Sequence, residues 1–91
     1  MSGVTIKSAR EVALVREACQ VAAATLLGVG RMIRAGISTE DINRYVHKDT
    51  LERGARPAPL NYHGFPKSVC TSINEVVCHG IPSDARRLEP G

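Results

Sequence analysis

Four side chains that could do chemistry lie close together in the sequence: His63, Cys70, Cys78 and His79. All four are residue types that ligate zinc, but structural zinc sites usually pair ligands two to four residues apart, and this stretch lacks that spacing. Cys70 could instead be a thiolate nucleophile with His79 as its base. No third group is evident that would orient the histidine. Both the metal site and the thiolate are therefore weakly supported by the residues alone.

His79 has a further interpretation, because it is followed by Gly80 and its imidazole titrates near neutral pH. It could donate a hydrogen bond to a bound carbonyl or amide, although a partly exposed strand histidine fits the composition equally well. His47 is expected to be an ordinary surface histidine. Cys19 is expected to be a small hydrophobic residue in the core.

The element that must position these residues is a β-hairpin over residues 68–79, where β-favouring residues flank a polar turn. A symmetric register pairs Cys70 with His79. Because side chains alternate along a strand, Cys78 and His79 should point to opposite faces. The face that packs against the helices is expected to contain Val69, Thr71, Ile73, Val76 and Cys78.

Two helices should precede the hairpin. Ser8 and Glu11 have the spacing of a capping box, which predicts a helix from there to about Arg34. A similar start at Ser38 predicts a second helix that ends at Gly54. The expected buried stripes are Val12, Val15, Cys19, Ala22 and Leu26 in the first helix, and Ile42, Tyr45 and Val46 in the second.

Residues 55–67 contain three prolines and most of the aromatic residues, so a shaped loop is expected there, with a short edge strand near Leu60 and no helix. Acid and base residues spaced four apart, Glu40 with Arg44 and Asp49 with Arg53, are expected to support the second helix.

The composition predicts one small globular domain: 91 residues and 9.8 kDa, with 43% hydrophobic and 3% aromatic residues. The net charge of +3 is spread along the chain, which argues against nucleic-acid binding. Three cysteines, an odd number, favour a reducing compartment. The longest apolar stretch, residues 21–27, is too short to cross a bilayer, so a soluble cytoplasmic protein is expected.

Residues 62–82 resemble the type I methionine aminopeptidases, and the run SINEVVCHGIP at residues 72–82 is highly specific to that family. The similarity extends from about Thr5 to Gly91. The resemblance implies the N-terminal part of an α/β (α+β) "pita-bread" fold, here two helices packed on an antiparallel β-hairpin. It also implies removal of the initiator methionine from nascent proteins by metal-activated water.

The resemblance assigns roles to individual residues. His79 matches a catalytic histidine that contacts the substrate and stabilises the reaction's intermediate. Tyr62, Phe65 and Cys70 match positions that line the pocket for the methionine side chain, and His63 matches a residue at the edge of the site. Pro59 stands where a cysteine is common and Phe65 where a tyrosine is frequent, and both fit an apolar pocket.

The family's metal ligands, two aspartates, a histidine and two glutamates, lie beyond the point that matches Gly91. The expected cofactors, two divalent ions such as Co, Mn, Fe or Zn, would therefore not be ligated by this chain. Residues 1–91 are expected to be one partial catalytic domain, truncated at Gly91 and inactive alone. The expected partners are the N-terminal methionine of nascent polypeptides, the ribosome and a second copy of the chain, with no nucleic acid or membrane. The alternative is a non-catalytic relative that binds peptide N-termini or a protein partner such as the ribosome.

Overall fold

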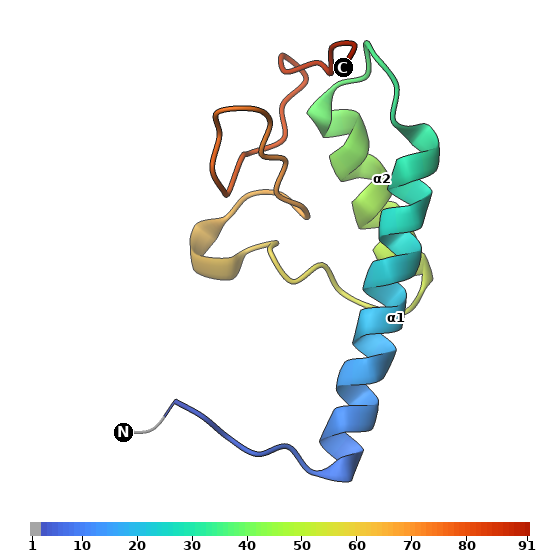
Figure 1. The fold of residues 1–91 in the computed structure, drawn as a ribbon, viewed down its shortest axis with the longest axis vertical. Helices are drawn as coiled ribbons and strands as arrows, with labels where there is room; N and C mark the ends of the chain where they lie inside the picture. Colours follow the sequence, from blue (N-terminus) through green and yellow to red (C-terminus); the bar gives the residue numbers. More distant parts are fainter. Residues whose placement is uncertain (1–2) are drawn as a thin grey trace.

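The computed structural model describes residues 3–91, and its framework is two helices that run side by side in opposite directions, α1 (Ala9–Met32) and α2 (Thr39–Glu52) (Figure 1). The predicted capping box begins α1: the main-chain N–H of Glu11 donates to Ser8 Oγ at 3.1 Å, and that of Ser8 donates to Glu11 Oε1 at 2.8 Å. These local bonds satisfy amides that have no partner within the helix.

The second helix starts in the same way. Ser38 Oγ accepts from the Asp41 amide at 3.0 Å, while the Ser38 amide donates to Asp41 Oδ2 at 2.9 Å. The helix ends before Gly54, whose φ of +78° allows the chain to reverse. Both expected pairs four residues apart are present, with Arg53 Nε 2.8 Å from Asp49 Oδ2 and Arg44 Nε 3.8 Å from Glu40 Oε2. The sequence prediction of both helices is therefore confirmed.

The two helices meet through small and polar residues on α1. Thr25 and Gly28 are its buried residues, and Thr25 Oγ1 donates to Asp49 Oδ2 of α2 at 2.8 Å. Ile37, Ile42 and Val46 form the buried core, and the partly buried side chains packed around it are Val29, Met32, Tyr45, Val69 and Leu88.

The apolar stripe expected to bury α1 is wrong. Cys19, predicted to lie in the core, is exposed. The other four members of the stripe, Val12, Val15, Ala22 and Leu26, are exposed as well. The physical reason is that α1 turns the neighbouring face, which contains Thr25 and Gly28, toward α2.

Helix α1 is long and apolar enough to cross a membrane by length and composition, a property that residues 21–27 considered alone did not reveal. A core helix of a soluble protein passes the same test, as does a signal sequence. Because only a small share of this helix is buried, most of its apolar surface faces outward.

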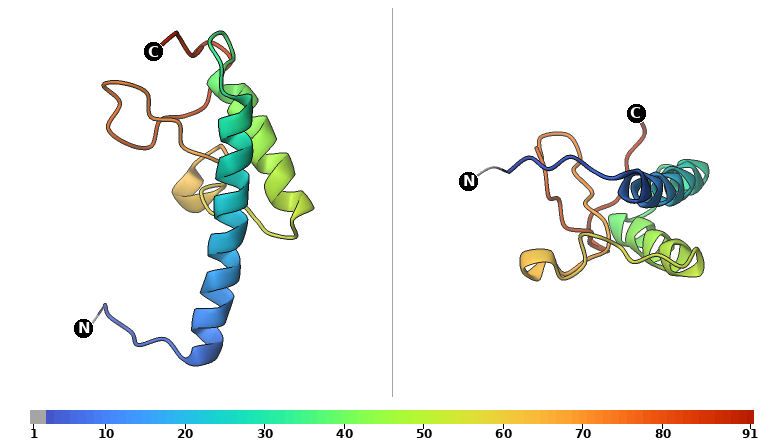
Figure 2. Two further views of the ribbon diagram at one scale, coloured as in Figure 1. Left: turned by 45° about the vertical axis from the view of Figure 1, so that its right-hand side comes forward. Right: turned by 90° about the horizontal axis from the view of Figure 1, so that it is seen from below.

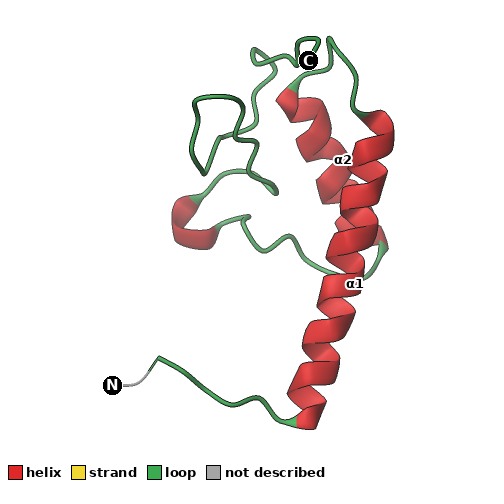
Figure 3. Cartoon of the chain, viewed as in Figure 1, coloured by secondary structure: helices red, strands yellow, loops and turns green. Residues whose placement is uncertain are grey.

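The rest of the chain, residues 55–91, lies as loops on one side of the helix pair (Figure 2). It contains one 3-10 turn, η1 (Tyr62–Gly64). The sequence predicted a loop here with a short edge strand near Leu60 and no helix, so this helical turn was not predicted. Within residues 3–91 no β-strand is formed (Figure 3). An isolated antiparallel bridge joins Ser38 to Arg87, and the amides of Thr39 and Gly36 donate to Arg86 O and Leu88 O, both at 2.8 Å.

The expected hairpin over residues 68–79 is therefore corrected to an irregular loop. It is closed by the Thr71 N–H, which donates to Gly80 O at 2.8 Å, so Thr71 lies opposite Gly80 and not Cys78. Asn74 and His79 both have left-handed backbone, with φ of 53° and 55°, which interrupts a ladder. An isolated two-stranded ribbon is only marginally stable in water, so nothing opposes these breaks.

The helix pair and the loops of residues 55–91 leave a broad apolar groove of about 800 Å³ between them. The side chains on its α1 wall include Val15, Cys19, Ala22 and Leu26 of the stripe predicted for the core. The radius of gyration is 15.2 Å, whereas a compact domain of this length has about 12 Å. The chain is thus open on the face where its apolar residues gather.

Candidate functional site

The aromatic residues expected to line a pocket lie in and beside η1. Tyr62 is 68% exposed, and its ring meets the His63 ring edge-on, with centroids 4.3 Å apart and planes at 84°. His63 has a left-handed φ of 48°, which interrupts the helical backbone of this short turn. Phe65, directly after the turn, is half-buried. These three residues are brought together by sequence proximity.

This aromatic turn, residues 59–65, is closed by its own main chain. The Asn61 N–H donates to Phe65 O at 2.8 Å, the Phe65 N–H to Tyr62 O at 3.0 Å, and the Tyr62 N–H to Pro59 O at 3.0 Å. Asn61 adopts φ of 66°, a conformation that asparagine tolerates better than most residues. The main-chain hydrogen bonds that close the turn are therefore all local.

The second part of the site is the loop closed between Thr71 and Gly80. The Gly80 N–H donates to Ser72 Oγ at 3.1 Å. The Cα of Gly80 lies so close to the Thr71 carbonyl that a Cβ there would be 2.7 Å from the Thr71 carbonyl carbon. Only glycine fits, and the close approach holds His79 at the mouth of the loop.

His79 is exposed. Its Nδ1 lies 3.8 Å from Cys78 Sγ, so the expectation that these neighbours point apart is wrong, because the left-handed backbone of His79 breaks the strand alternation. Among the hydrogen bonds of residues 3–91, none joins Cys70 to His79. This geometry does not join Cys70 and His79 as a thiolate and its base.

The donors of this chain do not fit a metal centre on their own. Within residues 3–91, no three side chains of histidine, cysteine, aspartate or glutamate gather closely enough to hold an ion. Cys70, Cys78 and His79 all belong to the loop side, but only the weak contact between Cys78 and His79 joins them.

Sequence reasoning missed a polar cluster on α2. Asn43 Oδ1 accepts from the main-chain N–H of Ser68 at 2.8 Å. His47 Nδ1 is hydrogen-bonded to Ser68 Oγ at 2.8 Å, so His47 is not an ordinary surface histidine. Lys67 Nζ donates to Glu40 Oε1 at 2.8 Å, and this bond lowers the pKa of the Glu40 carboxyl below its ordinary value.

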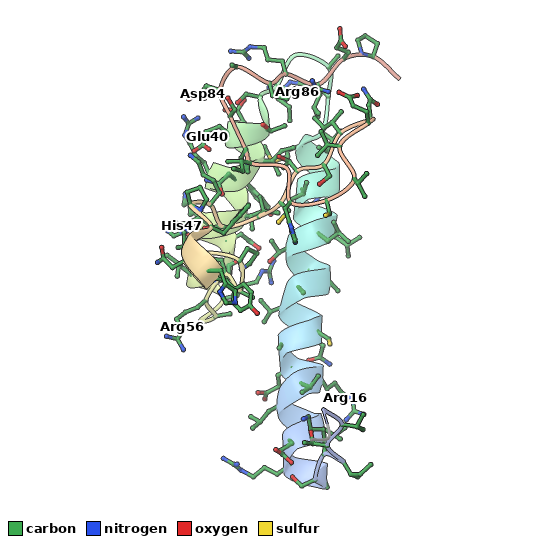
Figure 4. The ribbon with its side chains drawn as sticks, turned by 90° about the vertical axis from the view of Figure 1, so that its left-hand side faces the viewer. Arg16, Glu40, His47, Arg56, Asp84 and Arg86 are labelled. Carbon is green, nitrogen blue, oxygen red and sulfur yellow. The ribbon has the colours of Figure 1, made fainter. Side chains whose placement is uncertain are left out.

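The spacing of the three α2 residues, Glu40, Asn43 and His47, was the available signal. Residues three, four and seven apart lie on one face of a helix. Figure 4 shows Glu40 and His47 following one another down α2, while Arg16 lies at the far end of α1. The identity of their partners, Lys67 and Ser68, depends on the tertiary structure and could not be read from that spacing.

Residues 13–91 match the model of metallopeptidase family M24. The chain is 50% identical over 88 residues to methionine aminopeptidase 1A of Arabidopsis thaliana, covering 97% of this chain and 22% of the relative. It is also 50% identical over 88 residues to methionine aminopeptidase A of Synechocystis, where it covers 35% of the relative. Relatives named as mitochondrial or chloroplastic match as well.

Among solved structures, the crystal structure of methionine aminopeptidase from Rickettsia prowazekii superposes with a TM-score of 0.92 at 42% identity. The match covers 97% of this chain and 35% of that one. The chain thus spans between about a fifth and a third of the length of these relatives.

Proposed function

Because this chain belongs to metallopeptidase family M24, we propose that it forms the substrate-pocket side of an enzyme that removes the N-terminal methionine from peptides. The observation that supports this most is the superposition, over 97% of the chain, on a structure named methionine aminopeptidase. In this proposal residues 1–91 are one part of a catalytic domain of the pita-bread fold.

Within that function we assign His79 the catalytic role of donating a hydrogen bond to the substrate carbonyl. Its exposure and the close packing of Gly80 on the Thr71 carbonyl support this, because an imidazole must be accessible and held in one place to act on a substrate. An imidazole carries an N–H donor in either protonation state, so it can act in this way.

The methionine side chain would lie against Tyr62, His63, Phe65 and Cys70. An apolar, polarisable thioether suits aromatic rings and a thiol, and the exposed Tyr62 ring offers a free face for it. His63, packed edge-on against Tyr62, would form the rim of the pocket.

In this proposal the divalent ions are held by residues that the rest of the catalytic domain supplies. Such ions supply an activated water in metallopeptidases. Cobalt, manganese, iron and zinc remain the candidates. The remaining part of the fold would cover the apolar groove between α1, α2 and the loops.

We further propose that the substrate is the N-terminus of nascent chains at the ribosome, in the cytoplasm. All three cysteines are free, as is usual in a reducing compartment. A nascent chain presents its initiator methionine with no residue before it, which is the substrate that an exopeptidase requires.

The test joins this chain to the part of the Rickettsia prowazekii enzyme that follows the matched residues, giving a hybrid protein. With cobalt or manganese, the hybrid should release methionine from the peptide Met-Ala-Ser. His79→Ala should lower kcat by roughly a hundredfold while metal affinity changes little. Cys70→Ser should keep kcat, because in this proposal Cys70 contacts the methionine side chain and is not a nucleophile.

Binding of the peptide without turnover, by a folded and metal-loaded hybrid, would instead support a non-catalytic module that captures peptide N-termini. A collapse of metal affinity in His79→Ala would contradict the substrate-contact role of that histidine.

A further inference from the structure

The polar face of α2 holds the loop that carries the pocket residues. Asn43, which is 9% exposed, accepts from the main-chain N–H of Ser68, which is 4% exposed. The same amide group of Asn43 points its Nδ2 at the Glu40 carboxylate, at 3.3 and 3.4 Å from the two oxygens. Lys67 binds Glu40 from the loop side. Helix and loop are therefore joined through one continuous hydrogen-bonded cluster.

His47 adds the last member of this cluster, one helical turn further along α2. Its Nδ1 is 2.8 Å from Ser68 Oγ, so both polar groups of Ser68, the main-chain amide and the hydroxyl, are bonded to α2. Two bonds at different positions fix both the distance and the rotation of the segment against the helix. One bond alone would leave the rotation free.

Lys67 and Ser68 are the connection between the aromatic turn and the helices. Within residues 3–91, the hydrogen bonds that link residues 57–70 to α1 or α2 are those made by Lys67 and Ser68. The aromatic turn, by contrast, bonds to itself. The hydrogen bonds that couple the orientation of the aromatic turn to the helices are therefore those of residues 67 and 68.

Burial makes the hydrogen bond between Ser68 and Asn43 costly to break. A buried amide left without a partner is costly, so a displacement of the loop that breaks the Ser68 to Asn43 bond is unfavourable. Val69 of this segment also packs against the core, an apolar contact that has no directional preference.

We propose that Asn43 and His47 are positioning residues, which act through Ser68 to orient the aromatic turn and Cys70 toward the bound N-terminal residue of a peptide. The proposal rests on the proposed function for the identity of the ligand. The orientation itself is a property of this chain and can be measured without any peptidase activity.

The first experiment measures amide hydrogen exchange and residual dipolar couplings by NMR on the 91-residue chain. Asn43→Ala should raise the exchange rate of the Ser68 amide at least about tenfold relative to the amides of α2. It should also change the couplings of Tyr62 and Phe65 in the frame of α2.

Two further variants separate orientation from general stability. Thr25→Val is the matched control. It removes the partly buried hydrogen bond from Thr25 of α1 to Asp49 of α2, which does not involve the loop. It should leave the couplings of the aromatic turn unchanged. His47→Ala should shift those couplings, and His47→Asn should restore them, since an asparagine amide nitrogen can occupy the place of Nδ1. If Asn43→Ala does not fold, the comparison of His47→Ala with His47→Asn decides whether α2 orients the aromatic turn.

The second experiment connects orientation with binding in the hybrid protein. Asn43→Ala and His47→Ala should raise KM for Met-Ala-Ser several-fold more than they lower kcat, because a misplaced pocket weakens binding of the methionine side chain. Unchanged couplings in both variants, or changed couplings with an unchanged KM in an active hybrid, would overturn the proposal. An inactive parent hybrid contradicts the proposed function, and the couplings still decide whether the α2 cluster orients the turn.

Discussion

The phenol of Tyr45 occupies the space that a side chain on Gly28 would need. A Cβ on Gly28 would lie 2.7 Å from Tyr45 Cζ and 3.0 Å from Cε1. Glycine is otherwise unfavourable in the middle of a helix, by about 1 kcal/mol relative to alanine. Its presence in α1 is explained by this approach of α2, which lets the two helices come together near Thr25 and Asp49.

Gly28→Ala should therefore destabilise the chain by about 1–3 kcal/mol, since overpacking outweighs the gain in helix propensity. Gly30→Ala is the matched control: it lies in the same helix, and a Cβ there meets nothing within 4 Å. That substitution should stabilise the chain by about 0.5–1 kcal/mol. Urea unfolding followed by circular dichroism measures both, and equal effects would contradict the Tyr45 contact as the cause.

Gly80→Ala should open the loop that carries His79. A Cβ at this position would overlap the Thr71 carbonyl and lie 3.1 Å from Ser72 Cα, and main chain cannot yield as a side-chain tip can. Exchange of the Thr71 amide should rise at least about tenfold, since its bond to Gly80 O is lost. In the hybrid protein kcat should fall on the order of a hundredfold, because His79 is displaced.

The control for this loop is Val77→Ala, which truncates a fully solvated side chain in the same segment and should leave exchange and kcat unchanged. Retention of full activity by Gly80→Ala would show that His79 is not held in place by this close approach.

The stability of the chain should fall in acid partly through Glu40. Its pKa is lowered chiefly by the hydrogen bond from Lys67, with Asn43 and Arg44 adding to the effect against the cost of burial. A carboxyl whose pKa is lower in the folded state contributes stability above the range in which glutamate ordinarily titrates, about pH 4. That contribution is lost as the pH falls through the folded-state pKa.

The measurement compares urea unfolding of the parent chain and Glu40→Gln between about pH 6 and 3. The pKa values of Asp41 and Asp49 are lowered too, so the parent loses stability in acid for more than one reason. The difference between parent and Glu40→Gln isolates Glu40 and should shrink toward pH 3. A constant difference across the range would exclude a contribution from the Glu40 charge.

Predictions from sequence succeeded where their determinants are local and failed where the determinants are tertiary. The capping boxes at Ser8 and Ser38 depend on residues three apart, so sequence contains all their determinants. In the first half of the expected hairpin, the predicted alternation of buried and exposed side chains is present, since Val69 is half-buried and Cys70 is exposed. The ladder itself is absent from the described chain, because pairing depends on neighbours that alternation cannot supply.

The contacts of the site residues also divide into local ones, which sequence predicts, and tertiary ones, which it does not. The proximity of Tyr62, His63 and Phe65 follows from their adjacency in sequence. The bonds of Ser68 to Asn43 and His47 join positions far apart in the chain, and a helix-face pattern names only one side of such a contact. The correct stripe of α1 could not be chosen either, because helix α1 has apolar residues on more than one face.

The open groove should make the chain associate with itself. Leu26 lines the groove and is 70% exposed, while Leu27 is 65% exposed but does not line it. Burial of such apolar area is favourable by roughly 25 cal/mol per Å². Sedimentation equilibrium should show a mass that rises with concentration, and Leu26→Glu should reduce that rise.

Leu27→Glu is the matched control, with the same change of charge and nearly the same exposure on another face of α1. It should leave self-association unchanged. Equal effects of the two substitutions would mean that the groove is not the surface through which copies meet.

The first turns of α1 extend beyond the end of α2 and touch little else, as Figures 1 and 4 show for the part of the helix around Arg16. Side chains from Ala9 to Gln20 are all exposed there. Such a helix end frays at almost no cost in free energy, whereas the turns around Thr25 open only with the core. A trypsin-like protease would therefore cut readily after Lys7, Arg10 and Arg16, and the shortened chain would keep its capped second helix and its loops.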